Sequence, residues 1–149
     1  MKNSIEHDVA TDCLEFMFEY YTIVRKHIVE ENNVRFHSHS FYLLNILSCN
    51  KDNPLTMTAC AKEMNITKQQ LTKLADMHEA NGHVVRICDE FNRRQIKLQI
   101  TPQGEKYFER LKSVIIAEII GMLEKCSAKE KSEIQNCVKK LSVIMKEYE

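Results

Sequence analysis

The feature that most constrains the fold is the stretch 55–100, in which helical periodicity gives way to strand alternation. Thr56 is a good N-cap for a first short helix, and Thr67 is one for a second helix that reaches about Ala80. The three residues NIT separate the two helices, and Gly82 supplies the left-handed residue that ends the second. Two helices joined by so short a turn form the helix-turn-helix pattern.

Two runs typical of β-strands follow this pair of helices. The sequence HVVRIC covers 83–88, and QIKLQI at 95–100 alternates apolar and polar residues cleanly. The polar segment DEFNRR lies between them, which predicts an antiparallel hairpin with a basic tip. The chain has only three glycines and two prolines, so helices are favoured elsewhere. We therefore expect a mainly α fold with a small β-wing, built on a winged helix-turn-helix core.

Amphipathic helices are predicted on both sides of this core. Apolar residues at steps of three and four indicate a helix from Val9 to about Ile28, with Asp8 as its cap. A shorter helix begins near Ser38 or Ser40.

Downstream of the hairpin, Thr101 caps a helix that has Pro102 at its first position. The segment CSAKEK breaks the apolar stripe, and a last helix carries apolar residues from Ile134 to Tyr148.

The terminal helices present more apolar surface than one small module can cover. We expect a two-fold homodimer in which the first and last helices interlock, an obligate interface of the kind that buries ~2,000–5,000 Å². The chain then divides into an N-terminal dimerisation helix at 1–35, a winged helix-turn-helix domain at 36–103 and C-terminal dimerisation helices at 104–149, all parts of one compact chain.

The distribution of charge places any nucleic-acid surface in the middle of the chain. Lys plus Arg and Asp plus Glu both number 21, so the net charge is zero. Residues 54–103 nevertheless hold seven basic and five acidic side chains, whereas residues 1–35 hold four and seven. A few well-placed cations suffice for a local positive surface.

The hairpin tip and the second helix supply the candidate contacts with double-stranded DNA. The helix would lie in the major groove with its N-terminal turn inward, where Gln pairs with adenine and Lys meets phosphate or guanine. Arginine at a thin hairpin tip enters a narrow minor groove. The candidate DNA-binding residues are Thr67, Lys68, Gln69, Gln70, Thr72, Lys73, Asn92, Arg93 and Arg94.

These residues resemble the MarR family of bacterial transcription regulators. The family wing reads D-x-R followed five residues later by Leu-Thr; here Asn92 begins the motif, and QIKLQ leads to Ile100 and Thr101. The segment LTMTACAKEMNITKQQLTKLADMHEANGHVVR matches the family's helix-turn-helix. By this resemblance Arg94 is the wing-tip arginine. Asn92 replaces the usual Asp, and His78 replaces a large aliphatic residue.

The resemblance implies a homodimeric repressor that binds pseudo-palindromic DNA and is released from that DNA by a small ligand. It also implies an aromatic or phenolic effector in a crevice between the dimer helices and the DNA-binding lobe. Aromatic residues near that crevice are Tyr20, Tyr21, Phe36, Phe41 and Tyr42.

Three alternatives stay open: a redox sensor using Cys13, a metal sensor using His27, His37 and His39, and a winged-helix protein-interaction module without DNA binding. Six cysteines without a C-x-x-C pair are interpreted as reduced thiols, with Cys13 and Cys60 packing in the core. No catalytic or phosphate-binding motif is present, so we expect no enzyme, no cofactor and no metal. A polar N-terminus and short apolar runs predict a cytoplasmic protein without membrane contact.

Overall fold

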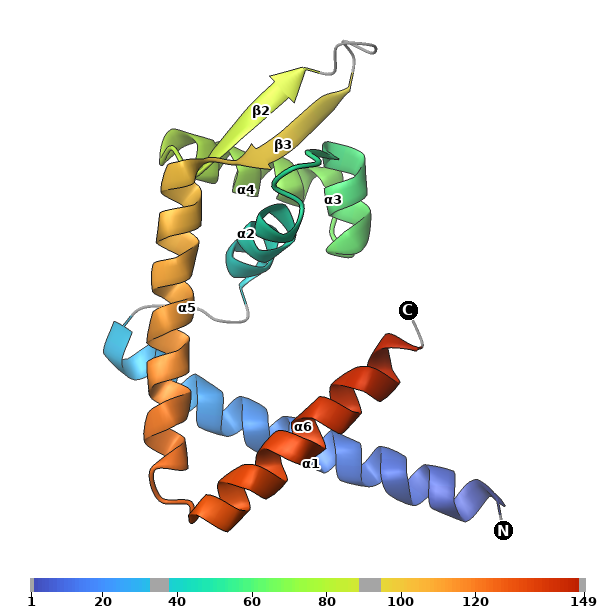
Figure 1. Cartoon of the computed structure of the whole chain (residues 1–149). Coiled ribbons are helices and arrows are strands. Elements are labelled where there is room, and N and C mark those ends of the chain that lie inside the picture. The colour runs from blue at the N-terminus through green and yellow to red at the C-terminus, as the bar shows by residue number, and fades with distance from the viewer. Residues whose placement is uncertain (1, 33–37, 89–94, 148–149) are drawn as a thin grey trace. The chain divides into compact units, whose positions relative to one another are not determined.

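The computed structural model describes residues 2–32, 38–88 and 95–147 (Figure 1). The chain forms two units, Met1–Ser113 and Val114–Glu149. The elements in order are α1 (Lys2–Asn32), α2 (His39–Cys49), β1 (Leu55–Thr56), α3 (Met57–Glu63), α4 (Lys68–Ala80), β2 (Val84–Cys88), β3 (Ile96–Ile100), α5 (Pro102–Leu123) and α6 (Ala128–Lys146).

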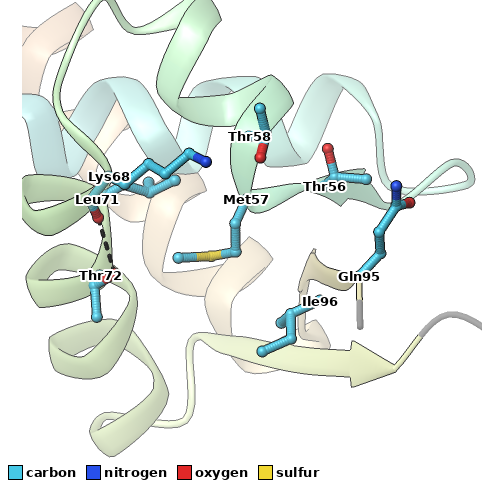
Figure 2. A pocket seen from close by; sticks show the side chains of 8 residues that line it. All are labelled: Thr56, Met57, Thr58, Lys68, Leu71, Thr72, Gln95 and Ile96. Atoms are coloured by element: carbon cyan, nitrogen blue, oxygen red, sulfur yellow. Dashed lines mark hydrogen bonds between the residues drawn. The ribbon is translucent and has the colours of Figure 1, made fainter. Parts of the chain in front are cut away.

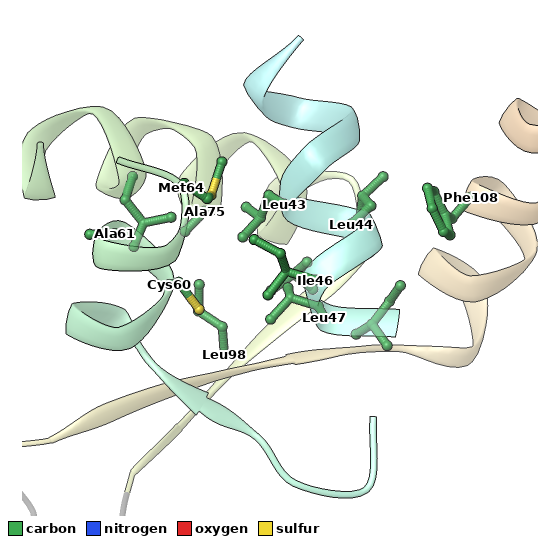
Figure 3. Packing of buried hydrophobic residues seen from close by; sticks show 13 residues of the cluster. Leu43, Leu44, Ile46, Leu47, Cys60, Ala61, Met64, Ala75, Leu98 and Phe108 are labelled. Atoms are coloured by element: carbon green, nitrogen blue, oxygen red, sulfur yellow. The ribbon is translucent and has the colours of Figure 1, made fainter. Parts of the chain in front are cut away.

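One hydrophobic core joins α2, α3, α4, the sheet and the first turns of α5. Figure 3 shows α2 in the middle of this cluster, with α3 on one side and Phe108 of α5 on the other. Phe108 is 2% exposed and its ring centroid lies 5.1 Å from that of Phe41. The buried members of the core are Leu43, Leu44, Ile46, Leu47, Cys60, Ala61, Met64, Leu71, Ala75, Val84, Leu98, Ile100 and Phe108.

The wing belongs to a three-stranded antiparallel sheet in the order β1-β3-β2. The predicted hairpin is confirmed, with Val84 opposite Ile100 and Cys88 opposite Ile96. The short strand β1 was not expected from the sequence, and it pairs Leu55 with Leu98. Two residues are too few to show alternation, so only the pairing in three dimensions defines this strand.

The predicted caps of the helix-turn-helix are confirmed. The Thr56 hydroxyl accepts a hydrogen bond from the backbone N–H of Ala59 at 3.1 Å, and Thr67 caps α4. Gly82 has a φ of +70°, the left-handed conformation expected after α4. Local capping chemistry therefore fixes both helix starts and the turn into the wing.

The terminal helices are longer than their apolar stripes indicate. Asp8 is not a cap, because α1 begins at Lys2 and Asp8 lies inside it. The segment CSAKEK does not separate two helices in full either, because Ser127 caps α6 through a capping box with Glu130 and the helix starts at Ala128. The polar residues of this segment interrupt the apolar stripe, yet its last residues form the cap and first turn of α6.

Neither terminal helix buries a described side chain in the single chain. Residues 5–22 of α1 and all of α6 are exposed, including the apolar residues of their predicted stripes. Within the described parts of the chain, no helix is both long and apolar enough to cross a membrane.

Candidate nucleic-acid interface

The first turns of α4 present an exposed polar surface. The predicted residues Thr67, Lys68, Gln69, Gln70, Thr72 and Lys73 are all exposed in the structure. On the opposite face Leu71 and Ala75 are buried in the core, which fixes the rotation of the helix about its axis. The packing of α4 therefore leaves its N-terminal polar face available to a ligand.

Three of these side chains make hydrogen bonds within α4 or to its N-cap. Thr67 and Gln70 form a capping box: the Thr67 backbone N–H donates to Gln70 Oε1 at 2.9 Å, and the Gln70 N–H donates to Thr67 Oγ1 at 3.2 Å. The Thr72 hydroxyl donates to the carbonyl oxygen of Lys68 at 2.8 Å. The side chains of Lys68, Gln69 and Lys73 make none of these hydrogen bonds, so they are the better-placed residues for contacting an external partner.

A groove of about 540 Å³ lies between the helix-turn-helix and the wing. Figure 2 shows residues of α4 on one side, the start of α3 on another and the start of the wing strand β3 on a third. Its lining combines the apolar side chains of Met57, Leu71 and Ile96 with polar side chains and one basic side chain. The lining residues are Thr56, Met57, Thr58, Lys68, Leu71, Thr72, Gln95 and Ile96.

The predicted wing-tip residues Asn92, Arg93 and Arg94 lie outside the described residues. The strands that would carry them are described, and β2 is tied to α4 by Arg86. The Arg86 guanidinium donates to Asp76 Oδ1 at 2.6 Å and to Glu79 Oε2. Burial alone would lower the pKa of Arg86, but the hydrogen bonds to Asp76 and Glu79 raise it, so the charge is fixed.

His78 is the one buried polar residue in the described core, at 2% exposed. Its Nε2 shares a hydrogen bond with the Ser40 hydroxyl at 2.8 Å, and its Nδ1 lies 3.4 Å from Nδ1 of His83. The His83 ring in turn stacks on Tyr107, with centroids 4.1 Å apart. Burial, and then the neighbouring His83, lower the pKa of His78 to about 4, so it is neutral at pH 7. Linked polar side chains thus stand where the resemblance leads us to expect a large aliphatic residue.

The cysteines differ in burial: Cys60 is buried, Cys126 is intermediate, and Cys13, Cys49, Cys88 and Cys137 are exposed. Cys60 is buried as expected, and burial followed by the charge of Glu63 raises its pKa to about 11, which makes it a poor nucleophile. Cys13 was expected in the core, but it is exposed in the single chain because α1 buries none of its described side chains.

Of the three histidines considered for a metal, only His39 has a described side chain. His39 is exposed, His37 lies outside the described residues, and the side chain of His27 is likewise not described. Among the described residues, no group of three or more His, Cys, Asp or Glu is arranged to hold a metal ion.

The aromatic residues assigned to an effector crevice have separate surroundings. Phe41 packs against Phe108 at the edge of the core, Tyr42 is exposed on α2, and Tyr20 stacks on Phe16 within α1. Tyr21 is exposed, and Phe36 lies outside the described residues.

Sequence reasoning missed three contributions to this surface. Thr58 and Gln95 line the groove, and Arg86 links the wing to α4. The sequence held a signal for Thr58, which lies in the first turn of α3. It also held one for Gln95, which lies on the polar side of an alternating run. For Arg86 the signal was weaker, because its carboxylate partners precede it by seven and ten residues and meet it only through the turn at Gly82.

The architecture defines the class of protein: the chain has the fold of the MarR family of winged helix-turn-helix regulators, and the resemblance predicted from the sequence is confirmed. A MarR family protein from Bacillus stearothermophilus superposes with a TM-score of 0.73 at 22% identity, covering 95% of this chain and 97% of that one. An S. aureus MepR mutant bound to an oligodeoxyribonucleotide superposes with a TM-score of 0.64 at 19% identity, covering 89% and 96% of the two chains.

One curated relative is similar in sequence. The HTH-type transcriptional repressor YetL of Bacillus subtilis is 31% identical over 91 residues, which cover 61% of this chain and 54% of the relative. The match thus spans about half of that repressor's length. No protein-family model matches the chain. YetL is a transcriptional repressor by its name, and the MepR mutant was solved with an oligodeoxyribonucleotide.

Proposed function

We propose that the chain is a sequence-specific, DNA-binding transcription regulator that acts as a repressor. The observation that carries this proposal is the exposed N-terminal face of α4 beside the groove that separates it from the wing strands. In this arrangement α4 enters the major groove of the DNA. One phosphate backbone of the duplex then passes along the groove on the protein surface, between Lys68 and Gln95.

Gln69 and Lys73 are the residues we assign to base edges and phosphates in the major groove, because their side chains take no part in the capping box and, unlike Lys68 and Thr72, do not line the groove beside the wing. Thr67, Lys68, Gln70 and Thr72 complete that surface. The backbone N–H groups at the start of α4 add to the attraction for phosphate.

The wing tip supplies the second contact in this proposal. Arg94, with Arg93 beside it, enters the adjacent minor groove, and Asn92 supports it by a neutral hydrogen bond. The paired strands β2 and β3, in register from Val84–Ile100 to Cys88–Ile96, would carry this tip. This contact explains how a chain with no net charge holds DNA.

A homodimer completes the proposed DNA-binding surface. The exposed apolar residues of α1 and α6, among them Phe18, Val138 and Val143, need a partner, and a second copy of the chain offers a complementary surface. Two α4 helices spaced ~34 Å apart would then meet successive major grooves of a pseudo-palindrome.

Release by a small aromatic or phenolic ligand is the regulatory part of the proposal. A ligand that prefers a different spacing of the two DNA-binding lobes shifts the population away from the bound form. A coupling of about 1–3 kcal/mol is enough for that response. A redox response through Cys13, whose thiol is not buried within the single chain, is a second candidate.

Selection from random duplex DNA tests the main proposal. The wild-type chain should enrich an inverted repeat, and affinity should fall with salt by a slope of about 0.9 per phosphate contact in the log-log plot. Arg94→Ala should weaken binding, whereas Arg110→Ala, an exposed arginine on α5 away from this surface, should not. Absence of salt-dependent binding would point instead to a protein-interaction module.

The same assay separates the two modes of regulation. Hydroperoxide treatment should leave DNA affinity unchanged if a small ligand is the signal. A loss of affinity that Cys13→Ser abolishes would make the chain a redox sensor.

A further inference from the structure

Arg86 makes three hydrogen bonds to α4 from its place in the middle of β2. Its Nη2 donates to Asp76 Oδ1 at 2.6 Å and its Nη1 donates to Glu79 Oε2. Its backbone N–H also donates to Glu79 Oε1 at 3.3 Å. Glu79 therefore accepts from both the backbone N–H and the guanidinium of Arg86. The contact thus fixes the position of the β2 backbone as well as that of the Arg86 side chain.

The chain between the two elements is a short turn. After Ala80 the backbone passes through Gly82 at φ +70°, and the His83 N–H returns to the carbonyl oxygen of His78 at 2.8 Å. The turn is also anchored at the base of the hairpin, where the Gly82 carbonyl oxygen accepts from the Thr101 hydroxyl at 2.6 Å and the His83 carbonyl oxygen accepts from the Thr101 N–H at 3.0 Å. These bonds lie at one end of the strands, so the direction in which the strands continue depends on contacts further along β2. Arg86 meets α4 beyond this turn and so attaches β2 to the helix at a second point.

The Arg86 side chain is sheltered relative to its partners. It is 23% exposed, against 59% for Asp76 and 41% for Glu79. A planar guanidinium shared by two carboxylates has fixed geometry, which an ammonium group lacks. The contact therefore has the rigidity that a brace between α4 and the wing requires.

We infer that Arg86 is a positioning residue that sets the angle between α4 and the β2–β3 hairpin, and so aims the wing at the minor groove when α4 lies in the major groove. This inference rests on the proposed DNA-binding function. In it Arg86 touches no base; it acts through the wing that it holds.

Charge neutralisation is the competing explanation. Asp76 lies four residues after Thr72 and three after Lys73, on the DNA-facing side of α4, where a free carboxylate repels phosphate. Arg86 would then help DNA binding by masking Asp76 and Glu79, with no effect on the angle of the wing. The two explanations predict opposite results when the carboxylates themselves are removed.

The decisive variant is the double substitution Asp76→Asn with Glu79→Gln. It makes the surface more positive, so neutralisation alone predicts tighter binding to the selected duplex. The brace predicts binding weaker by roughly tenfold or more, with loss of the minor-groove footprint while protection of the major groove persists. Arg86→Met should give the same altered footprint. The matched control, Asp52→Asn with Glu63→Gln, removes two exposed carboxylates elsewhere and should bind at least as tightly as wild type.

A second measurement needs no DNA. Amide residual dipolar couplings report the orientation of β2 and β3 relative to α4, and in both brace variants they should change while the couplings within α4 stay constant. Unchanged couplings together with tighter binding of the double variant would overturn the inference. If wild type binds no duplex at all, the functional proposal fails, and the couplings alone still decide whether Arg86 sets the angle.

Discussion

The winged-helix region and the terminal helices have similar sequence patterns but opposite burial. Apolar stripes predict helices in both, and helices form in both. In the winged-helix region the stripes of α2 and α4 meet other elements and bury Leu43, Leu44 and Leu71 completely. Along α6 and the described side chains of α1, the same pattern buries nothing in the single chain. An amphipathic stripe thus indicates that a helix packs against a partner, but it does not indicate whether that partner is in the same chain.

Truncating one buried and one exposed side chain should show this contrast most strongly. Phe108→Ala removes a ring that is 2% exposed and should lower the free energy of unfolding by about 3–5 kcal/mol. Val143→Ala on α6, where the side chain is 62% exposed, should cost less than about 0.5 kcal/mol at concentrations where the chain is monomeric. Urea unfolding followed by circular dichroism measures both, and equal losses would break the comparison.

The pH dependence of stability should come mainly from the winged-helix region. The pKa of His78 is about 4 in the fold against 6.5 in the unfolded chain, so the unfolded chain takes up the proton first as pH falls. Stability should therefore be full above pH 6.5 and fall by about 3 kcal/mol as pH drops toward 4. Burial also lowers the pKa of His83, which acts in the same direction.

The variant His78→Gln tests the source of this dependence. Glutamine keeps a hydrogen-bonding group near Ser40 but does not titrate, so the slope of stability between pH 6.5 and 4 should flatten. The urea midpoint measured across that range is the readout. An unchanged slope would assign the dependence to other groups.

Two glycines on the same helix extend the comparison. A Cβ at Gly104 would lie 2.0 Å from the carbonyl oxygen of His83, so Gly104→Ala must separate α5 from the turn before β2 and should cost about 1–3 kcal/mol. Gly121 has nothing within 4 Å of that position, so Gly121→Ala should stabilise the helix by about 0.5–1 kcal/mol. Thermal unfolding of the two variants checks the signs. A destabilising Gly121→Ala that also weakens self-association would place that part of α5 in a dimer interface.

The smallest effects should be the same in both regions, because capping is local. Thr67→Ala at α4 and Ser127→Ala at α6 each remove one partner of a capping box and should each cost about 1 kcal/mol. Helix content and unfolding midpoints measure both. A much larger loss for Thr67→Ala would mean that its hydroxyl supports tertiary packing as well.

The sequence predicted what depends on local chemistry. The caps at Thr56 and Thr67, the left-handed Gly82 and the alternation of Leu98 and Ile100 all have short-range signals, and the structure confirms them. It also predicted which face of α4 is exposed, because Leu71 and Ala75 mark the buried side.

Features that depend on contacts distant along the chain were not predictable. The strand β1 exists only through its pairing with β3, the Arg86 contact depends on how the turn folds, and the Ser40–His78 bond joins residues 38 positions apart. Cys13 was expected to be buried, and it is exposed in the single chain because nothing described in that chain covers the stripe of α1 on which it lies. The DNA contacts of Asn92, Arg93 and Arg94 stay predictions, since these residues lie outside those described.

The most direct test of the account is the stoichiometry of the complex with the selected duplex, measured by sedimentation equilibrium. We predict two chains on each inverted repeat and a dimer in the absence of DNA, with Val138→Asp on α6 shifting both toward single chains. A single wild-type chain per duplex at saturation, or no complex at all, would contradict the paired DNA reader proposed for this protein.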